Sequence, residues 1–94
     1  MPYLKQEDRA RLDRPITALV DVILFLSEVN EVGVAGQVNY IIARLFNSLW
    51  RGTKANYAGL NELIGAIECA KLEIYRRLAA RYEDAAVKRN GDVF

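Results

Sequence analysis

Histidine is absent from this chain of 94 residues, and cysteine, methionine and tryptophan occur once each. Without histidine, one chain forms neither a serine–histidine or cysteine–histidine catalytic pair nor a zinc site of mixed cysteine and histidine ligands. With Cys69 as the sole cysteine, no disulfide can close within the chain. Charge of one sign is also lacking, because 13 basic and 12 acidic residues leave a formal net charge of +1. This balance predicts no broad basic surface that would grip nucleic acid.

Long hydrophobic runs are missing as well. The longest apolar stretch, residues 16–26, still contains Thr17 and Asp21, whereas a membrane span needs about 20 apolar residues. Residues 1–13 are charged and lack the apolar region of a secretory signal peptide. We therefore expect a cytoplasmic protein without a membrane partner.

The apolar residues that are present make up 52% of the chain. Such a composition is typical of a folded chain, and we expect one helical domain over residues 1–94. The recurrence of apolar residues at spacings of three, four and seven predicts an all-α fold. A short turn and three main helices are expected at residues 6–12, 15–29, 37–51 and 57–88.

Capping residues indicate where these helices begin and end. Asp13 followed closely by Pro15 suits the start of the first helix, because proline needs no amide partner in a first turn. Gly52 suits the end of the second helix, and Thr53 or Asn56 the start of the third. The segment between the first two helices holds two glycines and an asparagine and predicts a loop.

The third helix is too long for the other two to cover. At 1.5 Å per residue, about 30 residues span ~45 Å, twice the length of either neighbour. The first helix is apolar on most of its circumference and also needs cover on several sides. Because monomers rarely leave large apolar areas in water, we expect a dimeric helical bundle, formed by a symmetric homodimer. The alternative is a third helix that breaks near residues 79–80 and folds back.

Lys71 lies within the apolar stripe of the third helix, which consists of Leu60, Leu63, Ile64, Ile67, Ile74, Tyr75, Leu78 and Tyr82. An ammonium group cannot be buried there without a partner. Glu68, three residues earlier, is the expected counterion, and Asp21 or Asn39 could complete a polar cluster. One interpretation is a buried site that binds an anion or transfers a proton. The other is a lysine that extends past the edge of the core at a helix crossing or dimer seam.

Carboxylates and basic residues carry two further possibilities. Glu28 and Glu31 form the only Glu-x-x-Glu pair, at a helix end, and di-iron bundles need a histidine that is absent. We therefore predict no metal site and no cofactor.

Basic residues could form a phosphate-binding surface, but acidic residues interleave with them, so nucleic-acid binding is not expected. These basic residues are Arg44, Arg51, Lys54, Arg76, Arg77, Arg81, Lys88 and Arg89.

Four local features of the sequence give further predictions. Tyrosines on or at the start of the helices suit an interface and a buried hydrogen bond equally. Cys69 lies opposite the apolar stripe and is expected to be inert. Asn90 and Gly91 should stop the third helix. Residues 92–94 should be extended, with residues 2–4 beside them.

Several strings within the chain resemble a family of small helical proteins of unknown function from bacteria and bacteriophages. They are Pro-Tyr-Leu-Lys-Gln-Glu-Asp-Arg at 2–9, Gly-Gln-Val-Asn-Tyr at 36–40, Glu-Cys-Ala-Lys-Leu-Glu-Ile-Tyr-Arg-Arg at 68–77, Tyr-Glu-Asp at 82–84 and Asn-Gly-Asp-Val at 90–93. The resemblance implies a small helical fold and carries no activity across. It directs attention to a candidate ligand-binding set of Asn39, Tyr40, Glu68, Lys71, Glu73, Arg76 and Arg77.

Two functions follow as hypotheses. The first is a non-catalytic helical interaction or accessory protein that associates with itself and has a further protein partner. It rests on the excess of apolar helix surface, the tyrosines and the shortage of catalytic residue types. The alternative is a small anion- or nucleotide-phosphate-binding protein, with weak metal-dependent hydrolase activity as an extension, that uses Lys71, Arg76 and Arg77 with Glu68 or Glu73.

Overall fold

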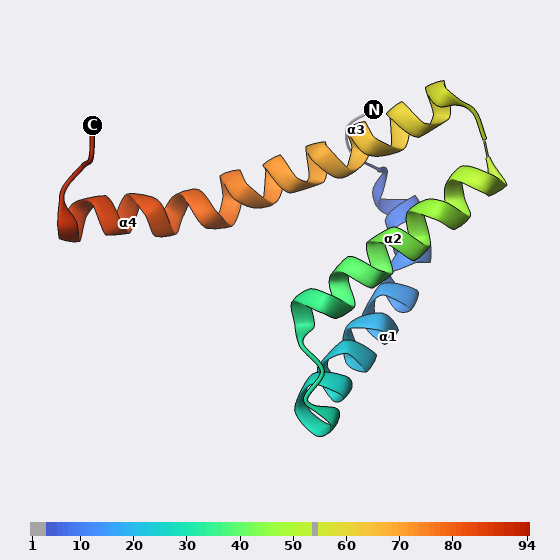
Figure 1. The fold of residues 1–94 in the computed structure, drawn as a ribbon, viewed down its shortest axis with the longest axis horizontal. Coiled ribbons are helices and arrows are strands. Elements are labelled where there is room, and N and C mark those ends of the chain that lie inside the picture. Colours follow the sequence, from blue (N-terminus) through green and yellow to red (C-terminus); the bar gives the residue numbers. More distant parts are fainter. Residues whose placement is uncertain (1–3, 54) are drawn as a thin grey trace. The chain divides into compact units, whose positions relative to one another are not determined.

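The computed structural model describes residues 4–53 and 55–94, and its elements are helical throughout that part of the chain (Figure 1). It contains three helices, the last of them long, which confirms the all-α prediction. The chain divides into two compact units, Met1–Leu45 and Phe46–Phe94. Within the described residues, no helix combines the length and the hydropathy that a bilayer crossing requires.

Helix α1 spans Gln6–Asn30, with Pro15 in its interior. The expected start at residues 13–15 and the separate turn at 6–12 were therefore wrong. The preceding residues are good helix formers, and Glu7 and Asp8 lie in the first turn, where carboxylates favour the positive end of the helix dipole. Helix propagation through these residues outweighs the hydrogen bond that Pro15 removes.

The connection between α1 and α2 (Val34–Gly52) is shorter than the expected loop, because only three residues lie outside the helices. Glu31 takes a left-handed conformation with φ 58°. The amides of Glu31 and Val32 both donate to the carbonyl of Leu26, which satisfies the end of α1. The side-chain amide of Gln37 donates to the carbonyls of Ile23 and Val32, each at 3.2 Å, and ties the start of α2 to α1.

A second corner joins the end of α2 to α3, which spans Tyr57–Ile74. Of the two predicted N-caps, Thr53 and Asn56, the cap is Asn56, whose side-chain oxygen accepts the Gly59 amide at 2.8 Å. The Trp50 indole donates to the Asn56 carbonyl at 3.0 Å, and the Thr53 hydroxyl donates to the Leu49 carbonyl at 2.6 Å. Half-buried apolar side chains gather here, and we call this group the corner cluster: Phe46, Trp50, Leu60 and Leu63.

The third long helix runs on from α3 through a π-helical turn, η1 (Tyr75–Ala79), into α4 (Ala80–Asn90). In Figure 1 these elements continue in one direction, from yellow to red. The amide of Ala80 donates to the carbonyl of Tyr75, five residues earlier, which defines the wider turn. The alternative of a break and fold-back at residues 79–80 is therefore wrong. We call residues 57–90 the C-terminal rod.

The C-terminal rod ends at Asn90, next to Gly91, as the glycine predicted. Gly91 has φ 86° and its amide donates to the Val87 carbonyl at 2.8 Å. Beyond it the amide of Phe94 donates to the Asp92 carboxylate at 2.9 Å, and residues 91–94 form no strand. The predicted neighbour of this segment falls at residues 2–4, of which 2 and 3 lie outside the described residues.

Apolar side chains stay largely in contact with solvent. Among the described residues, no apolar side chain is fully buried, and Gly59 is the one residue with a buried environment. The chain by itself leaves the apolar surface of α1 uncovered, as expected for a single copy, and its cover by a second copy stays a prediction. Its exposed large apolar residues are Leu12, Ile16, Leu19, Val20, Val22, Leu24, Phe25 and Val29.

Candidate functional site

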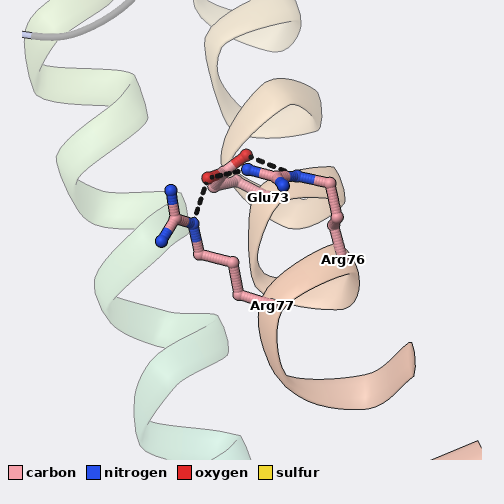
Figure 2. Close-up of polar contacts among 3 residues, drawn as sticks. All are labelled: Glu73, Arg76 and Arg77. Carbon is pink, nitrogen blue, oxygen red and sulfur yellow. Dashed lines mark hydrogen bonds and ion pairs between the residues drawn. The ribbon is translucent and has the colours of Figure 1, made fainter. Parts of the chain in front are cut away.

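A group of three charged side chains lies where α3 enters η1 (Figure 2). The Glu73 carboxylate accepts from Nη2 of Arg76 at 2.8 Å and from Nε of Arg77 at 2.5 Å. A longer bond of 3.4 Å runs from Nε of Arg76 to the second carboxylate oxygen. The spacings of three and four residues place both arginines one turn beyond Glu73. We call these three residues the Glu73 cluster.

The solvent exposure of the Glu73 cluster indicates how much its ion pairs contribute to stability. The Glu73 side chain is 31% exposed, whereas both arginine side chains are more than 60% exposed. Ion pairs of this kind contribute about 0–1 kcal/mol, because water screens the charges. The carboxylate already engages Arg76 through Nε and Nη2 and Arg77 through Nε, two groups that the anion-binding alternative requires. An external phosphate would have to compete with Glu73 for both guanidinium groups.

Lys71 forms the predicted ion pair with Glu68, and the distance between Nζ and the carboxylate is 3.1 Å. Of the two interpretations, the buried site is not observed, because the Lys71 side chain is 68% exposed. The ammonium group keeps most of its hydration and therefore avoids the desolvation penalty that would make it a strained group. The geometry agrees with a lysine at the edge of an apolar face.

The remaining candidates lie in the other unit. Tyr40 and Asn39 are exposed on α2, and the Tyr40 hydroxyl accepts from Nη1 of Arg44 at 3.2 Å. Asp21 is exposed on α1. The candidate set thus divides between the two units, and the polar cluster of Lys71 with Asp21 or Asn39 stays a prediction.

Metal-ligating groups do not gather in the part of the chain that the structure describes. No three cysteine, aspartate or glutamate side chains approach one another closely enough there to hold a metal ion. Cys69 is a free, exposed thiol. Of the basic residues considered for phosphate binding, Lys54 lies outside the described residues.

Sequence reasoning missed the contact between Tyr75 and Glu83. The Tyr75 hydroxyl donates to the Glu83 carboxylate at 2.6 Å, across eight residues. This hydrogen bond, with the negative charge of Glu83, raises the pKa of Tyr75 above its ordinary value of 10.0. In an uninterrupted α-helix, residues eight apart point about 80° away from each other. The π-helical turn brings the pair together, and only the 4-4 spacing of Ile74, Leu78 and Tyr82 hints at it in the sequence.

A shallow hollow opens on η1 and α4. Its lining consists of Leu78, Arg81, Tyr82 and Ala85, and most of that lining is apolar. Tyr82 and Leu78 are both strongly exposed. The hollow contains no catalytic pair of side chains and fits an apolar knob better than a charged ligand.

Comparison with known proteins identifies the family of the chain but assigns it no activity. No curated protein and no solved structure is significantly similar to it. The family model described as a domain of unknown function, DUF6899, matches residues 1–93. The match covers nearly the whole chain and includes every candidate site residue. The chain therefore belongs to the DUF6899 family.

Proposed function

We propose that this chain is a non-catalytic helical interaction protein that associates with itself and acts through apolar helix surface. The observation that carries the proposal is the lack of a fully buried apolar side chain among residues 4–53 and 55–94. A helical chain of 52% apolar composition gains most of its stability from covering that surface. A partner that covers it completes the hydrophobic core.

Exposed apolar side chains within each unit support this proposal. On α1, Ile16, Phe25 and Val29 are 54–63% exposed, and on the C-terminal rod Ile74 and Leu78 are 60% and 59% exposed. Large apolar areas in contact with water mark interaction surfaces. Self-association covers such an area, and a symmetric dimer needs only one surface.

The polar groups support a binding role over catalysis. The Lys71–Glu68 pair is neutral and the Glu73 cluster has a net charge of +1, and both lie on largely exposed helix surface where water screens the charges. A bacterial or phage source belongs to the same proposal, through the resemblance of the sequence strings. So does a cytoplasmic location, because a reducing compartment keeps an exposed thiol such as Cys69 unoxidised.

Sedimentation velocity tests the proposal on the full chain. Across a dilution series from high to low micromolar, we expect a species of twice 10.6 kDa that dissociates on dilution with one dissociation constant. A mass of 10.6 kDa at every concentration overturns self-association, since a chain that covers its surface by packing within itself sediments as a monomer. Thermal unfolding at the same concentrations provides a second readout, because the melting temperature of a dimer rises with concentration.

A further inference from the structure

The π-helical turn keeps the apolar stripe of the C-terminal rod on one side. Ile74, Leu78 and Tyr82 follow each other at intervals of four residues. In a continuous α-helix, Tyr82 would lie about 80° around the axis from Ile74. A turn closed by an i→i+5 hydrogen bond contains about one residue more than an α-helical turn. The residues after it are therefore rotated back around the helix axis by about 100°. The face that begins at Ile67 therefore continues past η1 to Tyr82.

The contact between Tyr75 and Glu83 is independent evidence for this register. These two residues are also eight apart and straddle the same turn, yet the hydroxyl and the carboxylate lie 2.6 Å apart. Such a distance requires both side chains to leave the rod on the same side. What holds for this pair holds for Ile74 and Tyr82, which are offset from it by one residue each.

The continuous face is open to solvent along its length. We define the rod face by its four large apolar residues, which are 40–81% exposed: Ile67, Ile74, Leu78 and Tyr82. Lys71 lies at its edge with an exposed ammonium group. The shallow hollow lined by Leu78, Arg81, Tyr82 and Ala85 adjoins the far end of the face.

Charge divides the rod into two halves of opposite sign. Helix α3 has three glutamates and one lysine, for a net charge of −2. The segment formed by η1 and α4 has five basic and two acidic residues, for a net charge of +3. Two rods side by side in the same direction place like charges together, whereas opposite directions place each negative half beside a positive half.

We infer that the rod face is the surface on which a second copy of this chain docks, with the two rods antiparallel. This inference rests on the proposed function and names its interface and orientation. An antiparallel pair that shares its midpoint, between Glu73 and Ile74, has the twofold symmetry of a closed dimer. It also sets the hollow beside Tyr82 opposite Ile64 of the second copy, whose exposed side chain fits an apolar hollow.

Distances between spin labels distinguish this arrangement from the others. Lys88 lies near the rod's end, and a label at Lys88→Cys, in a Cys69→Ser background, is expected about 45 Å from its twin in an antiparallel dimer. A parallel dimer gives about 10–20 Å at that position. A label on native Cys69, close to the midpoint, is expected at roughly 20 Å in either orientation and reports the pairing itself.

Three outcomes overturn the inference. A short distance at Lys88→Cys rejects the antiparallel orientation. Labels that show no coupling at either position, in a sample that sediments as a dimer, remove the rod from the interface while the proposed function stands. A chain that sediments as a monomer rejects the proposed function and this inference with it.

Changes in length test the register of the rod face without changing its composition. Inserting one alanine between Ala79 and Ala80 turns Tyr82 about 100° off the face, and we expect the dissociation constant to rise about tenfold or more. Deleting Ala79 instead removes the extra residue, lets η1 become α-helical and keeps Ile74 and Tyr82 aligned at a spacing of seven. We expect that variant to dimerise within about threefold of the parent. Equal effects of the two changes, in chains of unchanged helicity, would reject the alignment by η1.

Discussion

The corner cluster and the rod face belong to the same unit, yet the side chains of the first are half-buried and those of the second are exposed. At the corner the chain reverses (Figure 1), Phe46, Trp50, Leu60 and Leu63 are half-buried, and hydrogen bonds of Trp50 and Gly59 to Asn56 hold the reversal. Along the rod face the chain continues in one direction, and Ile74, Leu78 and Tyr82 stay exposed. Apolar patterning specifies a face that needs cover, while chain reversal decides whether the cover is intramolecular. Substitutions in the corner cluster should therefore lower the stability of the fold, whereas substitutions in the rod face should weaken association.

The largest expected effect is on association, from a charge placed in the middle of the rod face. Leu78→Asp removes apolar area and buries a carboxylate in the dimer, at about 3 kcal/mol, so the dissociation constant should rise on the order of 100-fold. Leu72→Asp is the matched control, because Leu72 is similarly exposed but lies on the opposite side of the rod. Sedimentation velocity measures both. Equal weakening by the two variants would mean that the rod face is not the binding surface.

At the corner, a truncation should act on folding instead. Trp50→Ala removes a half-buried indole and its hydrogen bond to Asn56, and we expect the free energy of unfolding to fall by about 2 kcal/mol. Tyr82→Ala, at a dilution where the chain is monomeric, should change it by about 0.5 kcal/mol or less. Urea titrations followed by circular dichroism measure both values. If Tyr82→Ala destabilises the monomer as much as Trp50→Ala, the two regions do not differ in kind.

A smaller gain in association is expected when the charge at the edge of the rod face is removed. Lys71→Met gives up an exposed ion pair with Glu68 and adds apolar area, so the dissociation constant should fall about fivefold. Lys88→Met makes the same chemical change on the far side of the rod and should leave the dissociation constant unchanged. Weaker association of Lys71→Met would mean that the ammonium group itself contributes to the dimer interface, which contradicts its place at the edge of the rod face.

The smallest effect concerns the hydrogen bond that spans η1. Its acceptor, Glu83, raises the pKa of Tyr75, first through the hydrogen bond and then through its charge. The bond stabilises the folded state below pH 10.0, and this contribution is lost as the pH rises through the raised pKa. Glu83→Gln should lower the pKa of Tyr75 toward its ordinary value. A pH titration monitored by NMR of the labelled tyrosine ring measures this pKa. Asp84→Asn, which removes a weaker charge effect, should shift the pKa less, and the reverse order would contradict the geometry.

Much of the fold could be predicted because it depends on local signals. The N-cap at Asn56 and the end of the rod before Gly91 follow from side-chain and glycine chemistry within one turn. The start of α1 was mispredicted, because a strong local signal at Pro15 was outweighed by helix formers on both sides. The Lys71–Glu68 pair was predicted from its spacing of three. The pairs of Glu73 with Arg76 and Arg77 were not predicted, although their spacings of three and four allow them.

The amino-acid sequence by itself determined the helical class, the start of α3 and the end of the rod, the apolar stripe and the Lys71–Glu68 pair, since all of these depend on residues within about two turns of each other. Only the tertiary structure decided that the third helix passes through η1 without folding back, and that Tyr75 and Glu83 meet. The physical reason is that a periodicity of 3.6 residues assumes one helix type throughout, whereas one wider turn shifts every residue beyond it around the axis. The structure also decided that Lys71 stays hydrated and the rod face exposed, because exposure depends on what packs over a side chain and not on its identity.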